Sequence, residues 1–180
     1  MKIKHTNIDG LVIIKPNLFY DSRGMFYESY NKRNLKSIFI KDFVQDNESK
    51  SLKGVIRGLH FQIPPYEQSK LVRCISGQIL DVVVDLRKKS KTYGRFFSTE
   101  LSSENKKQIY VPKGFAHGFQ ILSASAIVSY KVDNYYNPKF DSGIIWNDKC
   151  LSINWDTNIR PILSEKDQNL QSFKNFKTPF

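Results

Sequence analysis

The chain has 180 residues, 40% of them hydrophobic and 13% aromatic, which excludes a disordered protein and allows one domain with a substantial core. No apolar run approaches the length of a membrane span and the N-terminus has no secretion signal, so we expect a cytoplasmic protein without membrane contact. Basic residues (28) outnumber acidic ones (17) to give a net charge of +11, which favours an anionic partner, but the scattered lysines are more typical of a solvated surface than of a nucleic-acid stripe.

The first elements along the chain are short and are separated by turn residues. Residues 11–14 predict an early strand, and residues 19–28 resemble a loop that enters another strand. An apolar stripe predicts a short helix over residues 32–40. The polar run 44–49 carries amides suited to substrate hydrogen bonds, although Asn and Asp at this density are more typical of a turn.

Residues 55–62 predict a buried strand that carries unusual polar groups. Strict alternation separates its side chains into two faces, Ile56, Gly58, His60 and Gln62 against Val55, Arg57, Leu59 and Phe61. After Pro64-Pro65, the next strand places Lys70, Val72 and Cys74 on one face, so His60 and Lys70 can meet inside a small barrel. A lone strand histidine is usually structural, so chemistry at His60 depends on further groups converging on it.

The middle of the chain predicts several more strands. Gly77-Gln78 indicates a hairpin, and residues 79–87 form the strongest strand, with alternate apolar residues from Leu80 to Leu86 on one face. Further strands are expected at 95–101, 108–111, 117–122 and 126–132. Many short strands at even spacing with almost no helix indicate an antiparallel sandwich or barrel.

The end of the chain predicts anchors and a capped helix. Trp146 and Trp155 are expected in the core near one end of the barrel. Ser164 can cap a terminal helix with Asp167 as its third residue. Cys74 and Cys150 have neither metal-type nor redox-type spacing, and we assign them no function.

Segments along most of the chain together carry a resemblance to a known family. They are 57–62 (RGLHFQ), 68–73 (QSKLVR), 82–87 (VVVDLR), 112–119 (PKGFAHGF), 130–131 (YK), 145–148 (IWND) and 163–167 (LSEKD). In this order they closely resemble the dTDP-4-dehydrorhamnose 3,5-epimerase family, from about residue 11 to about residue 170.

The resemblance implies an all-β, double-stranded β-helix (jelly-roll, cupin-like) fold with short peripheral helices. We expect a single domain over 1–180, with a barrel core at about 11–160 and a C-terminal helical segment at about 163–180. It also implies a homodimer with shared active sites that acts without a cofactor or metal on a nucleotide-linked 4-keto-6-deoxy sugar.

The resemblance assigns roles to individual residues. His60 would be the base that removes a proton, held by Asp167, and Tyr130 the acid that returns one from the opposite face. Lys70 would stabilise the enolate oxygen, since a proton beside a ketone is acidic only when that oxygen can take the charge. The positions implied to bind the substrate are Arg23, Glu28, Gln45, Asn47, Arg57, His117, Tyr136, Asp141 and Lys166, with Tyr136 stacking on the base and some residues coming from the neighbouring subunit.

Several alternatives stay open. The family usually has Glu where this chain has Asp141, so the nucleotide could differ, and relatives with the same fold invert only C3 or act on other nucleotide sugars such as a GDP-heptose. A metal-dependent cupin would need more histidines than His5, His60 and His117. A module that only binds nucleotides or nucleic acid would not need His, Asp, Lys and Tyr in one pocket, and a regulator derived from such an enzyme is a further possibility.

Overall fold

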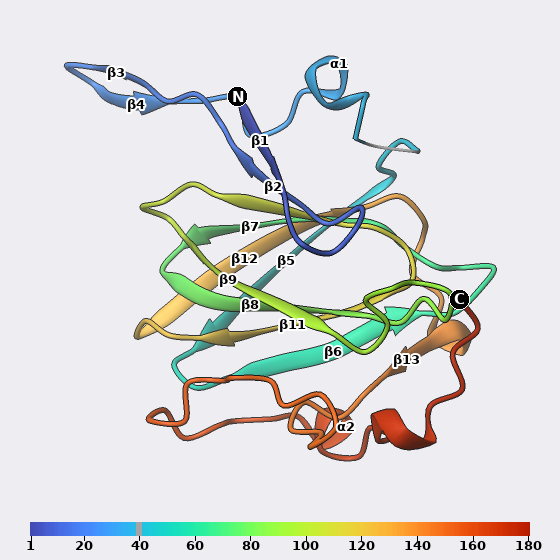
Figure 1. Ribbon diagram of the computed structural model, residues 1–180. Coiled ribbons are helices and arrows are strands. Elements are labelled where there is room, and N and C mark those ends of the chain that lie inside the picture. The colour runs from blue at the N-terminus through green and yellow to red at the C-terminus, as the bar shows by residue number, and fades with distance from the viewer. Residues whose placement is uncertain (39–40) are drawn as a thin grey trace.

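The strands pair into two antiparallel sheets (Figure 1). The structure, a computed structural model, describes residues 1–38 and 41–180. The first sheet has the spatial order β1 (Lys2–His5), β2 (Val12–Lys15), β10 (Gln108–Val111), β7 (Lys70–Ser76), β12 (Ser125–Val132) and β5 (Gln45–Leu52). The second has the order β13 (Asp141–Gly143), β6 (Ile56–Gln62), β11 (Phe115–Ile121), β8 (Gln78–Asp85) and β9 (Phe96–Ser102).

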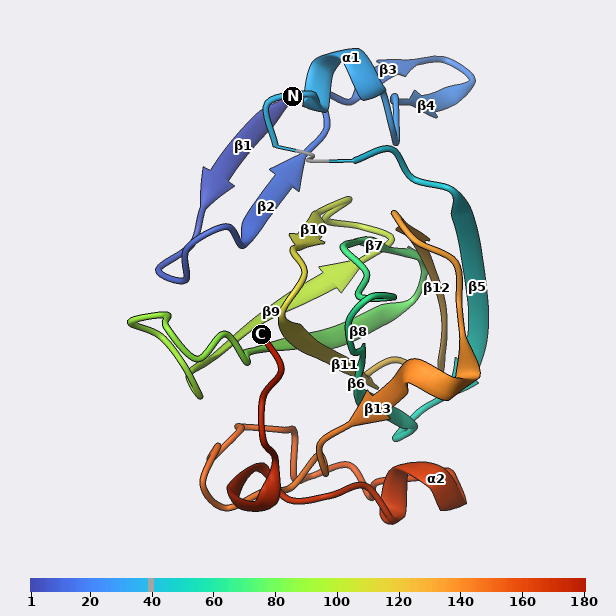
Figure 2. The same ribbon diagram turned by 90° about the vertical axis from the view of Figure 1, so that its right-hand side faces the viewer.

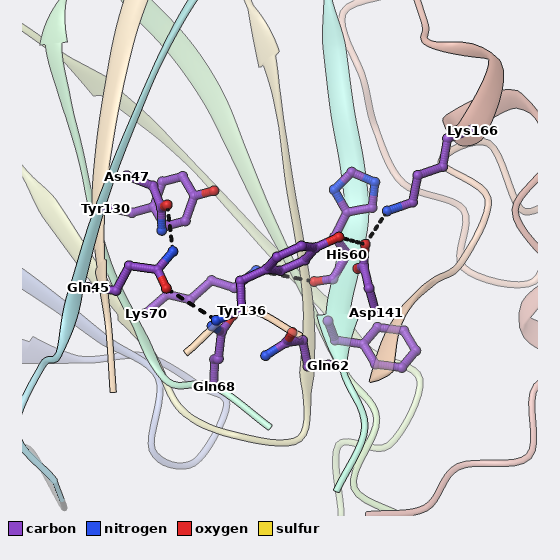
Figure 3. Close-up of a pocket in the computed structure, with 11 residues that line it drawn as sticks. Gln45, Asn47, His60, Gln62, Gln68, Lys70, Tyr130, Tyr136, Asp141 and Lys166 are labelled. Carbon is purple, nitrogen blue, oxygen red and sulfur yellow. Dashed lines mark hydrogen bonds and ion pairs between the residues drawn. The ribbon is translucent and has the colours of Figure 1, made fainter. Parts of the chain in front are cut away.

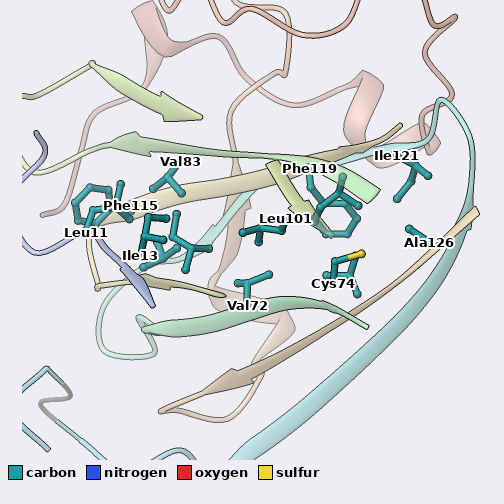
Figure 4. Close-up of a cluster of buried hydrophobic side chains, with 14 of the residues drawn as sticks. Leu11, Ile13, Val72, Cys74, Val83, Leu101, Phe115, Phe119, Ile121 and Ala126 are labelled. Carbon is teal, nitrogen blue, oxygen red and sulfur yellow. The ribbon is translucent and has the colours of Figure 1, made fainter. Parts of the chain in front are cut away.

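The chain passes repeatedly from one sheet to the other, which makes the jelly-roll predicted from the sequence. Of the strands from β5 to β12, only β8 and β9 are consecutive neighbours within one sheet. Alternate residues of each strand then point between the sheets, where Val72 and Cys74 of β7 pack with Val83 of β8 and Phe119 of β11 (Figure 4). The expected all-β, cupin-like fold is therefore confirmed.

Apolar layers cover the outer face of the second sheet and part of the outer face of the first. Val82, Val84 and Leu86, on the face of β8 predicted to be apolar, pack against the C-terminal segment through Trp155 and Phe176. This segment contains two one-turn helices, α2 (Glu165–Gln168) and η2 (Phe173–Asn175). The indole N–H of Trp155 donates to the Trp146 carbonyl at 2.8 Å, and the two rings meet edge to face, so these tryptophans anchor this layer as expected.

On the other side, the N-terminal part of the chain covers β2, β10 and β7 of the first sheet. The predicted helix is confirmed only as the single turn α1 (Lys32–Leu35), whose Leu35 is buried against Leu71 and Tyr110. Phe39 and Ile40, at the end of the expected helix, lie outside the described residues. The strands β3 (Phe19–Asp21) and β4 (Gly24–Phe26) form a hairpin that projects away from the barrel (Figure 1).

Two local expectations are wrong. The polar run 44–49 is no turn, because residues 45–52 form β5, which pairs with β12 along its whole length from Gln45↔Val132 to Leu52↔Ser125. Gly77 does not close a hairpin, because β7 and β8 belong to different sheets. It turns the chain between them with φ +79°, and a Cβ there would lie 2.2 Å from the Ser125 carbonyl oxygen, so only glycine fits.

Among the described residues, no helix is both long and apolar enough to cross a bilayer.

Candidate active site

A cavity of about 280 Å³ opens between the two sheets at the side where β5 and β13 lie (Figure 3). Its walls come from β5, β6, β7, β12 and β13, from the loop before η1 (Pro138–Phe140) and from α2. The lining residues are Gln45, Asn47, His60, Phe61, Gln62, Gln68, Lys70, Tyr130, Tyr136, Asp141 and Lys166. A deeper cavity of about 130 Å³ shares His60, Lys70 and Tyr130 with it and adds Ser49, Arg57, His117 and Phe119.

His60 is held by a buried carboxylate. Its Nε2 lies 2.5 Å from Oδ1 of Asp167, which is 3% exposed. Ser164 caps α2 as expected, by accepting a hydrogen bond from the Asp167 backbone N–H, and this cap fixes the carboxylate beneath the histidine. Burial raises the pKa of Asp167, but the hydrogen bonds from His60 and Ser164 outweigh it, so the pKa is lowered overall. An ionised Asp167 makes Nε2 the donor and leaves Nδ1 of the neutral ring as the basic atom.

Arg57 lies on the same side of β6 as His60, which corrects the strict alternation expected from the sequence. His60 pairs with His117 of β11, and Arg57 pairs with Phe119. The two β6 residues are three positions apart, but their β11 partners are only two positions apart, so β6 has one extra residue here. The extra residue is a bulge that turns Arg57 into the deeper cavity, where its Nε donates to Ser51 Oγ at 3.1 Å.

Gly58, within this bulge, permits the close approach of β11. It has φ +128°, and a Cβ would lie 2.6 Å from the Gly118 Cα. Neither position can therefore gain a side chain without moving the strand that carries His60.

Lys70 and Tyr130 come from the first sheet and therefore from the wall opposite His60. The Lys70 ammonium donates to the His60 carbonyl at 3.3 Å, and burial lowers the pKa of Lys70 to about 8 against the attraction of Asp141 and Asp81. Burial raises the pKa of the Tyr130 phenol, with Arg57 acting in the other direction. Tyr130 is therefore protonated at neutral pH and able to give a proton to a bound molecule.

A second histidine–carboxylate pair lies deeper in the barrel. His117 Nε2 is 2.8 Å from Asp81 Oδ2, and the two side chains are 6% and 0% exposed. The other oxygen of Asp81 is buried with no hydrogen-bond partner in the described part of the chain. Asp81 was not among the site residues expected from the sequence. A lone carboxylate in the strongest apolar strand nevertheless indicates a buried polar partner, because burying a carboxylate without one is costly.

The alternate residues of β5 supply a polar wall of the site. Gln45, Asn47 and Ser49 line the two cavities, and Ser51 holds Arg57. Ser49 was also missed, and its buried hydroxyl has no hydrogen-bond partner among the described residues. Every second side chain of β5 from Gln45 to Ser51 therefore faces the site, as the period of two in a strand requires.

Asp141 ties the mouth of the cavity together. Its Oδ2 accepts hydrogen bonds from Lys166 Nζ and, at 2.9 Å, from the Tyr136 hydroxyl (Figure 3). The Tyr136 backbone N–H donates to Gln45 at 3.1 Å, so the ring of Tyr136 lies across the opening between the two walls. The bond to Asp141 raises the pKa of Tyr136.

Arg23 and Glu28 do not reach the cavity of this chain. Arg23 lies at the tip of the projecting hairpin and pairs with Asp21 at 2.5 Å, while Glu28 accepts a hydrogen bond from Asn31 at 2.8 Å. All other predicted site residues lie around the two cavities, and only Arg23 and Glu28 lie apart from them. Among the described residues, no group of three or more His, Cys, Asp or Glu side chains could hold a metal ion.

The fold and the cavity define a cupin-like jelly-roll protein with an acid–base pocket between its sheets. The family model described as dTDP-4-dehydrorhamnose 3,5-epimerase matches residues 5–175. The chain belongs to this family of isomerases, as its sequence resemblance indicated.

Individual relatives are similar over nearly the whole chain. A dTDP-4-dehydrorhamnose 3,5-epimerase of Shigella flexneri is 47% identical over 96% of each protein. The crystal structure of one from Elizabethkingia anophelis is 49% identical, covers 97% of each chain and has a TM-score of 0.91. The dTDP-6-deoxy-D-glucose-3,5-epimerase of Legionella pneumophila, in complex with dTDP-4-keto-L-rhamnose, is 43% identical, covers 98% of this chain and 94% of its own, and has a TM-score of 0.94.

Proposed function

We propose that this protein is a cofactor-free epimerase that inverts C3 and C5 of a nucleotide-linked 4-keto-6-deoxy sugar, converting dTDP-4-dehydro-6-deoxyglucose to dTDP-4-dehydrorhamnose. One observation carries the proposal: a histidine–carboxylate pair and a protonated tyrosine, from opposite sheets, line the same cavity. Inverting a carbon needs a base on one face and an acid on the other, and this geometry supplies both. The Legionella relative carries the corresponding product.

Each inversion proceeds through an enolate. His60 takes the proton next to the ketone, and Asp167 stabilises the imidazolium that forms. Lys70 stabilises the negative charge on the C4 oxygen, which is strongest in the transition state and its enolate. Tyr130 then gives its proton to the opposite face of the same carbon, and exchange with water restores both residues, so the reaction consumes nothing.

The nucleotide part lies toward the mouth of the cavity. Lys166 supplies a cation for phosphate oxygens there, and the amides of Gln45 and Asn47 supply hydrogen bonds. Arg57 supplies a second cation from the deeper cavity. Tyr136 would leave its bond with Asp141 and stack on the base. His117, held by its hydrogen bond with Asp81, contacts the sugar from the deeper cavity.

Arg23 and Glu28 act in a homodimer in which the β3–β4 hairpin of one subunit reaches the cavity of the other. The support is the hairpin itself, which projects from the barrel with Phe19 59% exposed, Tyr20 73% and Phe26 67%. Aromatic surface of this extent is typical of a contact with another protein chain. The domain extends over 1–180 as one catalytic unit, and the protein acts in the cytoplasm, where nucleotide sugars are made.

Incubation with dTDP-4-keto-6-deoxyglucose in D2O tests the activity. Mass spectrometry should find two deuterons in the product, and reduction should reveal inversion at both carbons. One deuteron would establish a C3-only epimerase instead. No exchange with this substrate, but exchange with a GDP-linked 4-keto heptose, would move the assignment to the other nucleotide sugar, and no exchange with either would contradict the catalytic roles.

A further inference from the structure

A further cavity, of about 320 Å³, lies at the opposite side of the barrel from the two cavities that contain the predicted catalytic residues. Most of its lining residues come from β1 and β2 of the first sheet and β9 of the second, and Figure 2 shows the places of these strands. The lining residues are Lys4, His5, Thr6, Asn7, Ile13, Lys15, Phe97, Thr99 and Lys107. The three lysines form no ion pair within the described part of the chain, and no acidic residue is among the described lining residues. We infer that this cavity binds a compact polyphosphate group carried by a small molecule.

Strand register shows that these lysines point between the sheets. Ile13 of β2 lies in the inner core, so Lys15, two residues on, faces the same way. Lys107 directly precedes β10 and lines the same cavity. Lys4 stands directly opposite Ile13 and shares its face. Lys4 and Lys15 are exposed and Lys107 is half-buried, so the three ammonium groups stand at the open rim of the cavity, where an anion from solvent can reach them.

The cations form a row of like charge across neighbouring strands. Lys2, which does not line the cavity, is directly opposite Lys15. Gln108 pairs with Ile14, so the lining residue Lys107 comes next to Lys15 on the other side. Like charges directly opposite each other destabilise a sheet. An anion bound over the row would offset the repulsion between the lysines.

Protection of an edge strand explains only part of the row. Inward-pointing lysines on an edge keep sheets from joining edge to edge, and β1 is the edge of its sheet. Lys15 is the last residue of β2, and Lys107 directly precedes β10. Both strands are paired on both sides and have no edge to protect. These two lysines therefore need another explanation.

The dimensions indicate a chain of two or three phosphates. Strands lie about 4.8 Å apart, so three cations on successive strands cover about 10 Å, too wide for one phosphate. Ile13 and Phe97 give the cavity an apolar floor beside the cations. A volume near 300 Å³ is at the lower end for small-molecule sites, which fits a phosphorylated metabolite better than a polymer.

Calorimetric titration with inorganic tripolyphosphate tests the site. The double variant Lys15→Ala/Lys107→Ala should weaken binding tenfold or more, because it removes two charge contacts of about 1 kcal/mol each. The matched variant Lys149→Ala/Lys174→Ala removes the same charge from exposed positions in the C-terminal layer and should bind as the wild type does. Inorganic phosphate should bind much more weakly than tripolyphosphate.

The catalytic cavity also carries cations, and Lys166→Ala separates the two sites. Tripolyphosphate binding that survives in Lys166→Ala and disappears in Lys15→Ala/Lys107→Ala supports the second site. The reverse pattern, or no binding to the wild type, overturns it. Folding of the double variant is not at risk, because relief of the repulsion should raise its melting temperature in the absence of anions.

Discussion

Replacing Lys70 with methionine should remove most activity and at the same time stabilise the folded protein. The two effects have one cause, because the same ammonium that faces the enolate is held in a buried place. An ammonium about 3 Å from an enolate oxygen contributes roughly 5 kcal/mol at an effective dielectric constant near 20. Removal of one donor to a developing oxyanion lowers kcat by about 10² to 10³, and 5 kcal/mol corresponds to about 5 × 10³. We therefore expect Lys70→Met to lower kcat by at least about 10².

The stability gain follows from the pKa of Lys70. Burial lowers it from the ordinary 10.5 to about 8, so the unfolded chain binds the proton more tightly than the folded one. This difference corresponds to roughly 3 kcal/mol, and because water reaches part of the side chain we expect a gain of about 1.5 to 3 kcal/mol at pH 7. As pH rises from 8 toward 10.5, the penalty on the wild type disappears and the gain with it.

Two measurements check this reasoning. Urea unfolding of wild type and Lys70→Met at pH 7 and pH 10 should show a gain that shrinks at the higher pH. The kcat/KM of the wild type should fall about tenfold per pH unit above pH 8, because the ammonium is lost. The control Lys70→Arg stays charged and should lack this fall. Equal stability of the two proteins at pH 7, or a wild-type rate that is constant up to pH 10, would refute the reasoning.

Further variants separate the roles of the other groups. Tyr130→Phe should lose inversion but still exchange substrate protons with D2O, since His60 acts before it; loss of exchange would contradict the order. Asp167→Asn should lower kcat by about 10² to 10⁴ with little change in KM, and an unchanged kcat would show that His60 needs no carboxylate. Asp81→Asn should raise KM and destabilise the fold by about 1 to 3 kcal/mol in thermal or urea unfolding, whereas unaltered kinetics would restrict it to packing. Mixing inactive His60→Ala and Arg23→Ala proteins, after dissociation and reassociation, should restore about a quarter of wild-type activity, because half of the dimers are mixed and each has one intact site. No recovery would argue against shared sites.

The strands and the faces of β8 were predictable because they depend on local residue pattern. Val82 and Val84 pack outward and Val83 inward, as period-two alternation requires. The capping role of Ser164 also followed from local sequence, since a cap needs only neighbouring residues.

What the sequence could not provide depends on pairing between distant strands. The bulge that brings Arg57 to the side of His60 exists only in the register of β6 against β11. The polar strand β5 owes its conformation to the ladder with β12, which overrides the turn preference of Asp46 and Asn47. Gly77 has the same local signal whether the chain turns within a sheet or between sheets, and only the partners of β7 and β8 decide.

The contact between His60 and Asp167 joins residues 107 positions apart in the chain. The histidine belongs to the barrel, whereas the carboxylate belongs to the last layer, which is attached through the packing of Phe176 and Phe180 on Phe61. During synthesis the barrel strands leave the ribosome first, and the catalytic pair is completed only when the final segment has been made and has docked. A newly made chain is thus inactive until this layer has docked. A local detachment of the layer would switch the base off while the barrel remains folded.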